Sequence, residues 1–291
     1  MKSQSNRMIC REGWVVAALM LLGVGCASAS GEDEPGAEPQ SNPTEQGSAD
    51  HTAGSQIRLH EGTEAPAEDA LNTDSVASPL VTQTSGADVS GYQGNVNWSS
   101  AASAGARFVY IKATEGTSYT NPYFAQQYNG SYNQGLIRGA YHFALPGNSS
   151  GTTQANYFVD HGGGWSADGK TLPPALDMEY NPYGATCYGL SASAMVTWVR
   201  DFSNRVHART NRYPIIYTST SWWSQCTGNN SSFGSTNPLW IPRYGSSVGT
   251  LPAGWSYQTI WQYADSGSMP GDQDRFNGAY DRVQAFATNH D

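Results

Sequence analysis

The chain has 291 residues, of which 38% are hydrophobic and 12% aromatic, enough for one large domain with its own core. The formal net charge of −9 is unevenly distributed, because eleven acids and a single base, Arg58, lie between Glu32 and Asp74. From residue 75 onward, eleven Lys and Arg face twelve Asp and Glu. This nearly neutral part excludes the basic surface that is typical of a nucleic-acid-binding protein.

Residues 1–26 have the features of an export signal. Three basic residues precede the apolar run WVVAALMLLGVG (14–25), which is too short to span a bilayer comfortably. Two processing signals follow: Ala27-Ser28-Ala29 is a small-residue cleavage site, and LGVGC resembles a bacterial lipobox with Cys26 as the lipidated residue. We therefore expect an exported protein, either secreted or anchored as a cell-surface or outer-membrane lipoprotein.

Residues 27–84 are expected to form a disordered acidic linker. They are rich in Gly, Pro, Ser, Thr, Glu and Gln and poor in aromatic and branched apolar residues. Such a segment buries too little apolar surface to offset the entropy lost on ordering. The remaining residues, 85–291, are expected to form a single globular domain.

Within this domain, short apolar runs alternate with longer amphipathic ones. The clearest expected helices are TTQANYFVDHG (152–162) and SASAMVTWVRDFSNRVHART (191–210). Alternation of strands and helices predicts βαβ units in a mostly parallel sheet. Seven or eight strands in about 205 residues favour an irregular TIM-like α/β barrel, because the later strands leave little room for helices. The expected strands are 86–92, 107–114, 137–144, 174–180, 214–219, 238–244 and 259–264.

Acids and other polar residues stand where three of these strands end. Asp88 lies in the first strand, Lys112 and Glu115 lie in KATEG, and Asp177 and Glu179 lie in LDMEY. Functional residues of parallel α/β barrels sit at the carboxyl ends of the strands. Side chains two apart in a strand share a face, with Cα atoms roughly 6.6 Å apart. Asp177 and Glu179 should therefore face the barrel mouth together, and their proximity should raise the pKa of at least one of them.

Such a pair suits the cleavage of a sugar. One carboxyl kept protonated can act as a general acid, and the abundant Tyr and Trp offer flat faces for pyranose rings. The alternative is an acidic strand end without function, or a carboxylate pair that binds a divalent ion.

The cysteines predict one disulfide. Cys10 and Cys26 lie in the signal segment, which leaves Cys187 and Cys226 as an even pair in an exported domain. Two isolated thiols lack the paired spacing of zinc sites, and the six His residues form no HExxH-like pattern. We expect no metal, no cofactor and a monomer.

Seven motifs follow one another along the domain. In chain order they are GADVSGYQGNVNW, FVYIKATEGTSYTNPYF, RGAYHFA, ALDMEY, PIIYTS, LWIPRY and IWQY. Together they resemble glycoside hydrolase family 25, the family of N-acetylmuramidases (lysozymes), over residues 85 to 290, and the resemblance is to the fungal and actinomycete-type branch in particular. It implies hydrolysis of the β-1,4 bond between N-acetylmuramic acid and N-acetylglucosamine in peptidoglycan.

The resemblance also implies roles for individual residues. Glu179 matches the general acid, Asp177 the second acid of the D-x-E pair, and Asp88 the acid on the first strand. Groove or substrate-binding positions are Tyr141, Tyr217, Trp261, Asp274, Glu115 and Lys112, although each aromatic residue could also be plain core. His142 should face away from Tyr141 and pack.

The family usually ends in a D-x-N-x-F element. QDRFNGAY matches this element with Asp274 in place of its Asp, but Phe276 stands where Asn is expected. This departure leaves open whether Asp272 or Asp274 reaches the groove.

Two other classes of function compete with a lysozyme. A non-catalytic glycan-binding barrel would lack one acid of the D-x-E pair, and both are present. A chitinase-type hydrolase normally carries D-x-x-D-x-D-x-E, whereas LPPAL before Asp177 contains no acid.

The mechanism also has two candidates. A strand pair two residues apart lies between the spacings of retaining and inverting carboxylates. We expect attack by the substrate's own 2-acetamido group, oriented by Asp177, with direct attack by a carboxylate as the rival.

Overall fold

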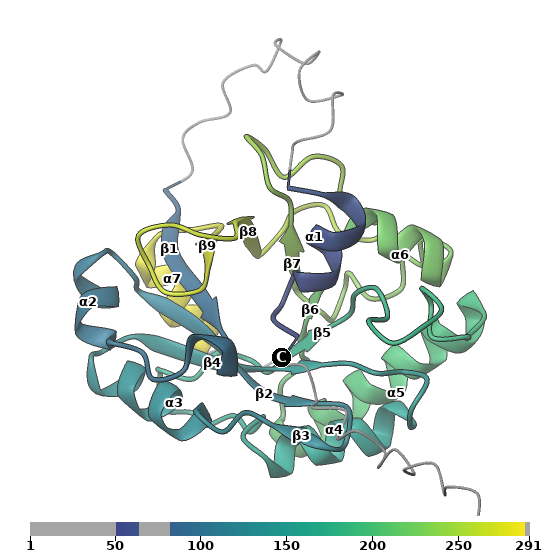
Figure 1. Ribbon diagram of the computed structural model, residues 1–291, viewed down its shortest axis with the longest axis horizontal. Helices are drawn as coiled ribbons and strands as arrows, with labels where there is room; N and C mark the ends of the chain where they lie inside the picture. The colour runs from purple at the N-terminus through teal and green to yellow at the C-terminus, as the bar shows by residue number, and fades with distance from the viewer. Residues whose placement is uncertain (1–50, 64–81, 289–291) are drawn as a thin grey trace, which may run out of the picture. The chain divides into compact units, whose positions relative to one another are not determined.

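Eight strands close into a barrel in the computed structural model, which describes residues 51–63 and 82–288 (Figure 1). The strand order is β1-β9-β8-β7-β6-β5-β4-β2, and a β1–β2 pairing closes the ring. Neighbouring strands are parallel except that β9 runs antiparallel to both β1 and β8. The strands are β1 (Thr84–Val89), β2 (Phe108–Glu115), β4 (Ile137–Phe143), β5 (Ala175–Asp177), β6 (Ile215–Tyr217), β7 (Leu239–Pro242), β8 (Ile260–Ala264) and β9 (Asp272–Phe276).

Helices surround the barrel and confirm the irregular α/β architecture that the sequence predicts. Three helices begin at a serine whose side chain accepts a backbone N–H: Ser150 before α4, Ser191 before α5 and Ser219 before α6. No helix separates β7, β8 and β9. The helices of the domain are α2 (Trp98–Ser103), α3 (Phe124–Asn133), α4 (Gly151–Asp160), α5 (Ala192–Thr210), α6 (Thr220–Thr227) and α7 (Tyr280–Thr288), with a short 3-10 turn η2 (Gly91–Gln93) and the two-residue strand β3 (Tyr119–Thr120).

Three strand predictions need correction. The first strand ends at Val89, because the Ser90 side chain caps η2 and turns the chain. The strand carrying the paired acids ends at Asp177, so Glu179 lies in the loop just beyond it. Strand β9 was not predicted, because its sequence DQDRF contains acids where an apolar run was sought.

The predicted disordered linker (27–84) is wrong over part of its length. Residues Ser55–Glu61 form helix α1, and the described residues on both sides of the gap belong to one compact unit. Ala53 and Ile57 of this segment are buried in the main core cluster. The physical reason is that the barrel, rather than the segment itself, supplies the apolar and polar partners. The signal segment and the rest of the linker lie outside the described residues.

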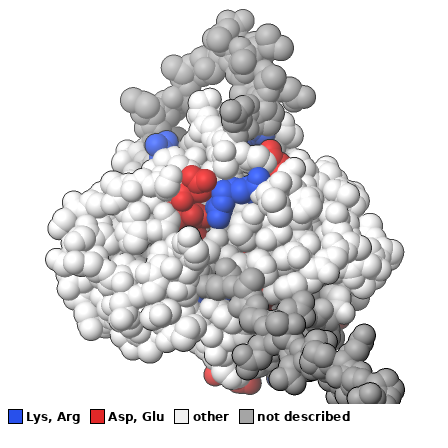
Figure 2. All heavy atoms as spheres, viewed as in Figure 1, with Lys and Arg blue, Asp and Glu red and all other residues white. Residues whose placement is uncertain are grey.

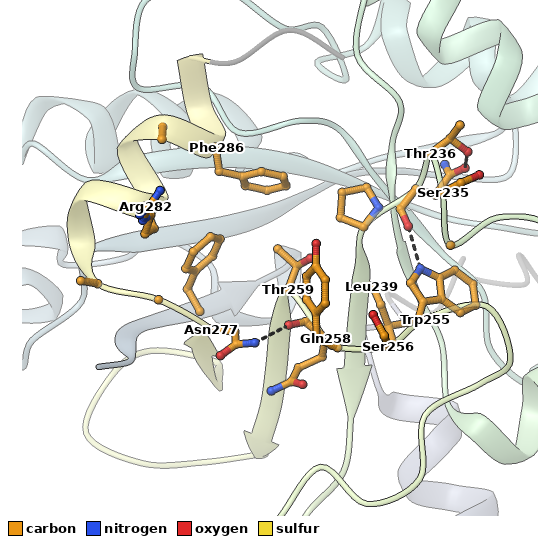
Figure 3. A pocket seen from close by; sticks show the side chains of 18 of the residues that line it. Ser235, Thr236, Leu239, Trp255, Ser256, Gln258, Thr259, Asn277, Arg282 and Phe286 are labelled. Carbon is orange, nitrogen blue, oxygen red and sulfur yellow. Dashed lines mark hydrogen bonds between the residues drawn. The ribbon is translucent and has the colours of Figure 1, made fainter. Parts of the chain in front are cut away.

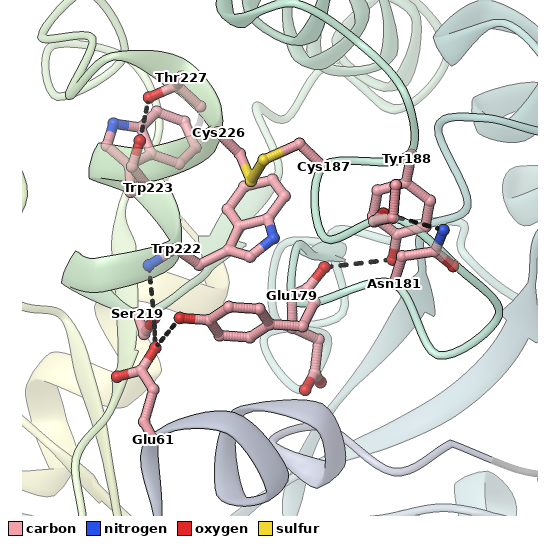
Figure 4. The surroundings of a disulfide bond; sticks show 12 residues. Glu61, Glu179, Asn181, Cys187, Tyr188, Ser219, Trp222, Trp223, Cys226 and Thr227 are labelled. Atoms are coloured by element: carbon pink, nitrogen blue, oxygen red, sulfur yellow. Dashed lines mark hydrogen bonds between the residues drawn. A yellow bond between two sulfur atoms is a disulfide. The ribbon is translucent and has the colours of Figure 1, made fainter.

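The predicted disulfide joins Cys187 to Cys226 with a Cα–Cα distance of 5.3 Å, which confirms that prediction. It ties the loop after β5 to helix α6 (Figure 4). In this loop Tyr188 donates a hydrogen bond to the backbone oxygen of Glu179. The disulfide thus stabilises the segment that follows the paired acids.

A pocket of about 790 Å³ opens at the end of the barrel opposite the paired acids, between the start of β7 and the end of β9 (Figure 3). The Trp255 indole donates to the Asn237 backbone oxygen beside it, and Asn277 donates to the Gln258 backbone oxygen. None of the described helices is long and apolar enough to cross a bilayer.

Candidate active site

The carboxyl groups of the site gather where the parallel strands end. Asp88 lies near the end of β1, and Asp177 is the last residue of β5. Strand β9 runs the opposite way, so its first residue is at this end, and Asp272 pairs with Asp88 across the β1–β9 ladder. All these residues are at most 5% exposed. The barrel therefore concentrates several acids in a space that water barely reaches.

Asp177 and Glu179 form the central pair. Asp177 is fully buried, and no N–H or hydroxyl among the described residues donates to either of its carboxylate oxygens. Burial raises the pKa of Asp177 well above its usual range, and the charge of Glu179 raises it further. Burial also raises the pKa of Glu179, although three backbone N–H groups and Asp177 oppose that shift. Two carboxyls this close hold one proton between them more readily than two charges.

The other acids form a second group around Gln262 and Trp240. The Gln262 amide Nε2 lies 2.8 Å from Asp88 Oδ2 and 3.1 Å from Asp272 Oδ2. The Trp240 indole donates to Asp274 Oδ1 at 2.9 Å. Burial raises the pKa of Asp88 and of Asp274 well above the usual range, and the pKa of Asp272 to about 7, where the Arg58 guanidinium opposes the shift.

The β1–β9 ladder shows where Asp272 and Asp274 lie. Residues two apart on β9 share a face, so Asp272 and Asp274 both point into the barrel, but Asp272 lies at the mouth and Asp274 one layer below. Asp272 is therefore nearer than Asp274 to the paired acids' end of the barrel.

Lys112 and Glu115 face the groove together because β2 bulges between Lys112 and Thr114. The irregularity lets residues three apart share the inner face, where Lys112 Nζ lies 2.7 Å from Glu115 Oε2. Thr114 instead bonds His142 on the outer face. Burial would raise the pKa of Glu115, but hydrogen bonds and charges from His51 and Lys112 outweigh burial and lower it.

Two of the three predicted aromatic groove residues are in the barrel interior. Tyr141 and Tyr217 are fully buried around Trp240, and the Tyr217 hydroxyl donates to Gln262 Oε1 at 2.8 Å. Trp261 is not in the groove: its indole donates to the Arg243 backbone oxygen. Arg275 lies over the Trp261 ring. Because Asp272 and Asp274 of β9 point into the barrel, Arg275 next to them points outward, and so does Trp261 beneath it. The neighbouring Gln262 faces inward instead.

His142 packs on the outer face of the barrel, as predicted. Its ring stacks on Phe202 and bonds Gln154, and burial lowers its pKa to about 4.

Two polar residues of the barrel mouth, Gln262 and Tyr244, are not among the predicted site residues. The Tyr244 hydroxyl donates to Gln262 Oε1 at 2.6 Å, so this amide links two phenols to two acids. A glutamine inside the apolar strand IWQYA was a usable signal, because a buried amide must find polar partners. Among the described residues, no group of three or more His, Cys, Asp or Glu is arranged to hold a metal ion.

The segment 51–63, which was predicted to be disordered linker, also contacts the predicted site residues. Figure 1 shows α1 beside β5, β6 and β7, and hydrogen bonds join it to Glu179 and Tyr244. Acidic and basic side chains lie side by side on the face seen in Figure 2, most of which is uncharged. Arg58 of α1 forms an ion pair with Asp272.

A closed α/β barrel with buried paired carboxyls at its strand ends defines the class of acid–base glycosidases. Residues 87–272 match the family model Glycosyl hydrolases family 25. The chain belongs to this family, as its motifs predicted.

Relatives of the predicted branch are similar to most of the barrel. The N,O-diacetylmuramidase of Chalaropsis sp. is 55% identical over 207 residues, which cover 70% of this chain and 98% of that protein. Lysozyme M1 of Streptomyces globisporus is 51% identical over 209 residues, 70% of this chain and 71% of that one. The solved structure of a family GH25 lysozyme from Aspergillus fumigatus is 50% identical with a TM-score of 0.70, and it covers 72% of this chain and 100% of its own.

Proposed function

We propose that the protein is a lysozyme that hydrolyses the β-1,4 bond between N-acetylmuramic acid and N-acetylglucosamine in peptidoglycan. The observation that carries the proposal is the buried pair Asp177 and Glu179 at the mouth of a family 25 barrel, with the pKa of both groups raised. A raised pKa keeps a proton available for the leaving oxygen near neutral pH. The names of the Chalaropsis and Streptomyces relatives support the same activity.

The proposed chemistry divides the roles between the two acids. Glu179 gives its proton to the glycosidic oxygen as the bond to the anomeric carbon breaks. The carbonyl oxygen of the substrate's 2-acetamido group bonds to that carbon, while Asp177 orients the amide N–H and balances the growing positive charge. Water then opens the ring intermediate and returns a proton to Glu179. Asp88 and Asp272 would hold substrate or water, and Tyr141 and Tyr217 would line the groove.

We also propose that the protein acts outside the cytoplasm. The Cys187–Cys226 disulfide is typical of exported domains, and the predicted signal segment agrees with it. Of the two processing routes, a lipid anchor at Cys26 would keep the enzyme at the cell surface, and cleavage after Ala29 would release it.

Clearing of a bacterial cell-wall suspension, compared with release of sugar from chitin, tests the function. Clearing of walls with little release from chitin is the expected result. Release from chitin alone would support a chitinase-type hydrolase, and binding without release from either polymer would support a glycan-binding barrel.

A further inference from the structure

The backbone of residues 51–63 donates hydrogen bonds to Glu179, the acid that we propose as the proton donor. Gly54 N–H donates to Glu179 Oε1 at 2.7 Å, while Gln56 and Ile57 N–H donate to Oε2 at 2.8 and 3.0 Å. Both oxygens of Glu179 are therefore engaged by one short stretch of chain. These hydrogen bonds oppose the rise in the pKa of Glu179 that burial causes, and they occupy the oxygens that would otherwise face a glycosidic oxygen.

Side chains of the same segment also pair with other acids of the groove. Arg58 Nη1 lies 2.6 Å from Asp272 Oδ2, and its side chain is only 20% exposed. His51 Nδ1 lies 2.9 Å from Glu115 Oε1. Arg58 is the single Lys or Arg between Glu32 and Asp74. The one base of an otherwise acidic stretch therefore forms an ion pair with an acid of the groove.

Groups that could otherwise contact a sugar are also covered. Tyr141 accepts a hydrogen bond from Ala53 N–H, and the Lys112 ammonium donates to the His51 backbone oxygen at 2.6 Å. Glu61 accepts hydrogen bonds from Tyr180 and Ser219 at the other end of α1 (Figure 4). The contacts thus run along the groove rather than at one point.

Gly54 fits the groove only because it has no side chain. Its φ of +83° is a conformation that favours glycine. A Cβ at this position would lie less than 3.0 Å from the Tyr244 and Tyr217 hydroxyls and from Gln262 Oε1. The backbone approaches the floor of the groove as closely as a ligand would.

We propose that residues 51–63 are an intramolecular inhibitor that fills the glycan-binding groove and lowers the activity of the full chain until the segment is displaced or removed. The inference rests on the proposed function, because the groove blocked is the one assigned to peptidoglycan. Segment and glycan compete for the same carboxylates and phenols, so they exclude one another. Since both belong to one chain, the segment binds at a high effective concentration.

The coverage of the relatives agrees with an added regulatory element. The Aspergillus fumigatus lysozyme is matched along its whole length and covers 72% of this chain. The part of this chain that the Aspergillus fumigatus structure covers is therefore about as long as the barrel, residues 82–288. The family model begins at residue 87, beyond the inhibitory segment.

Three substitutions in the full chain test the proposal by lysis of a bacterial cell-wall suspension. Arg58→Ala removes the ion pair to Asp272, and Gly54→Val forces the backbone off the groove floor. Each should raise kcat/KM by about tenfold or more, because losing one buried, hydrogen-bonded charge contact shifts an equilibrium by that much. Leu59→Ala is the matched control, since Leu59 lies on α1 but is 74% exposed, and it should leave activity as in the wild type. Wild-type activity equal to that of Arg58→Ala would overturn the proposal.

Trypsin cleavage after Arg58 gives a second measurement that does not depend on catalysis. In the full chain Arg58 is held by Asp272 and Tyr244, so cleavage should be slow. Saturating N-acetylglucosamine tetramer should speed it about tenfold or more by displacing the segment. A small chromogenic trypsin substrate in the same tubes checks that the sugar does not act on trypsin.

The two measurements separate the proposals. If no variant lyses walls but the tetramer still exposes Arg58, inhibition stands and the proposed lytic function fails. If cleavage after Arg58 is rapid without sugar, and the wild type lyses walls as fast as the variants, inhibition fails and the function stands.

Discussion

Asp177 and Glu179 leave β5 two residues apart and place two carboxyl groups against each other, both at most 1% exposed. Strand β5 ends between them, yet both still face the mouth, because the chain continues in the strand direction where Met178 N–H donates to the Tyr217 backbone oxygen. Burial and the neighbouring carboxyl raise the pKa of Asp177, whereas three backbone N–H groups oppose the rise that burial causes in the pKa of Glu179.

Glu179→Gln should abolish wall lysis while the fold remains. The amide keeps the size of the side chain but removes the proton donor, and loss of general acid catalysis typically costs about 10²–10⁴-fold in rate. The substitution should be made in the Arg58→Ala chain, so that inhibition does not mask the change. Rates of wall clearing and the near-ultraviolet circular dichroism spectrum give the answer. Lysis near the parent rate would reject Glu179 as the acid.

The same substitution should also loosen the inhibitory segment. The new amide NH₂ would face the backbone N–H of Gly54, or those of Gln56 and Ile57. Both sides would then be hydrogen-bond donors, so these N–H groups would lose their acceptor. In an otherwise wild-type chain, Glu179→Gln should therefore be cut after Arg58 faster than the parent, although it lyses nothing.

Asp177→Asn should slow lysis by about 10²-fold, the usual cost of removing one preorganised electrostatic contact, with little change in the binding of N-acetylglucosamine tetramer. The neutral side chain can still occupy the space, but it no longer balances charge on the acetamido group. Isothermal calorimetry and initial rates in the Arg58→Ala background separate the two effects. A parallel incubation with a 2-fluoro sugar followed by intact mass tests the rival mechanism. A stable covalent adduct on Asp88, Asp177 or Asp272 would refute attack by the acetamido group.

The sequence predicts the strands that carry this pair because their apolar runs are strong and are followed by acids. It does not predict β9, whose inward positions are Asp272 and Asp274 and whose outward position is Arg275. A strand with acids on its inner face looks like a loop unless the barrel that buries it is already known. The same dependence on the barrel explains why the sequence alone leaves open whether Asp272 or Asp274 reaches the groove.

The direction of Trp261 was wrong for a related reason. Both faces of IWQYA are buried or half-buried, so alternation does not say which set of residues points inward. Gln262 decides it, since the amide requires the polar partners that only the barrel interior supplies. Helix α1 is not predictable from the composition of residues 27–84, because that stretch is polar and acidic as a whole. The partners that stabilise α1 belong to the barrel rather than to this stretch.

Loss of the disulfide should destabilise the domain and disturb the loop beside the acids. Cys187 and Cys226 are 39 residues apart, and the chain-entropy model gives about 4 kcal/mol for a loop of this length, with 2–4 kcal/mol typical. The free energy of unfolding of the Cys187→Ser, Cys226→Ser double variant, measured in urea, should fall by about this amount. Reduction of the wild type is the matched control and should give the same loss. A change below about 1 kcal/mol would show that the bond is not needed for stability.

Asp274→Asn should make the folded protein less sensitive to alkaline pH. Burial raises the folded-state pKa of Asp274 well above the ordinary value of 3.8. Between the unfolded and folded pKa values the native state keeps a proton that the unfolded state has released. The free energy of unfolding therefore decreases as pH rises, by at most about 1.4 kcal/mol per pH unit for one proton. This stability is complete below the unfolded pKa and is lost as pH rises through the folded pKa.

Asparagine cannot ionise, and its side-chain oxygen can still accept the hydrogen bond from the Trp240 indole. Urea unfolding at pH 5 and pH 8 should show a smaller fall in the free energy of unfolding for Asp274→Asn than for the wild type. Asp281→Asn on the exposed side of α7 is the matched control and should behave as the wild type. If Asp274→Asn and the wild type lost equal stability between the two pH values, Asp274 would not hold a proton in the folded state, and its carboxylate would have to be ionised beside Asp88 in the barrel.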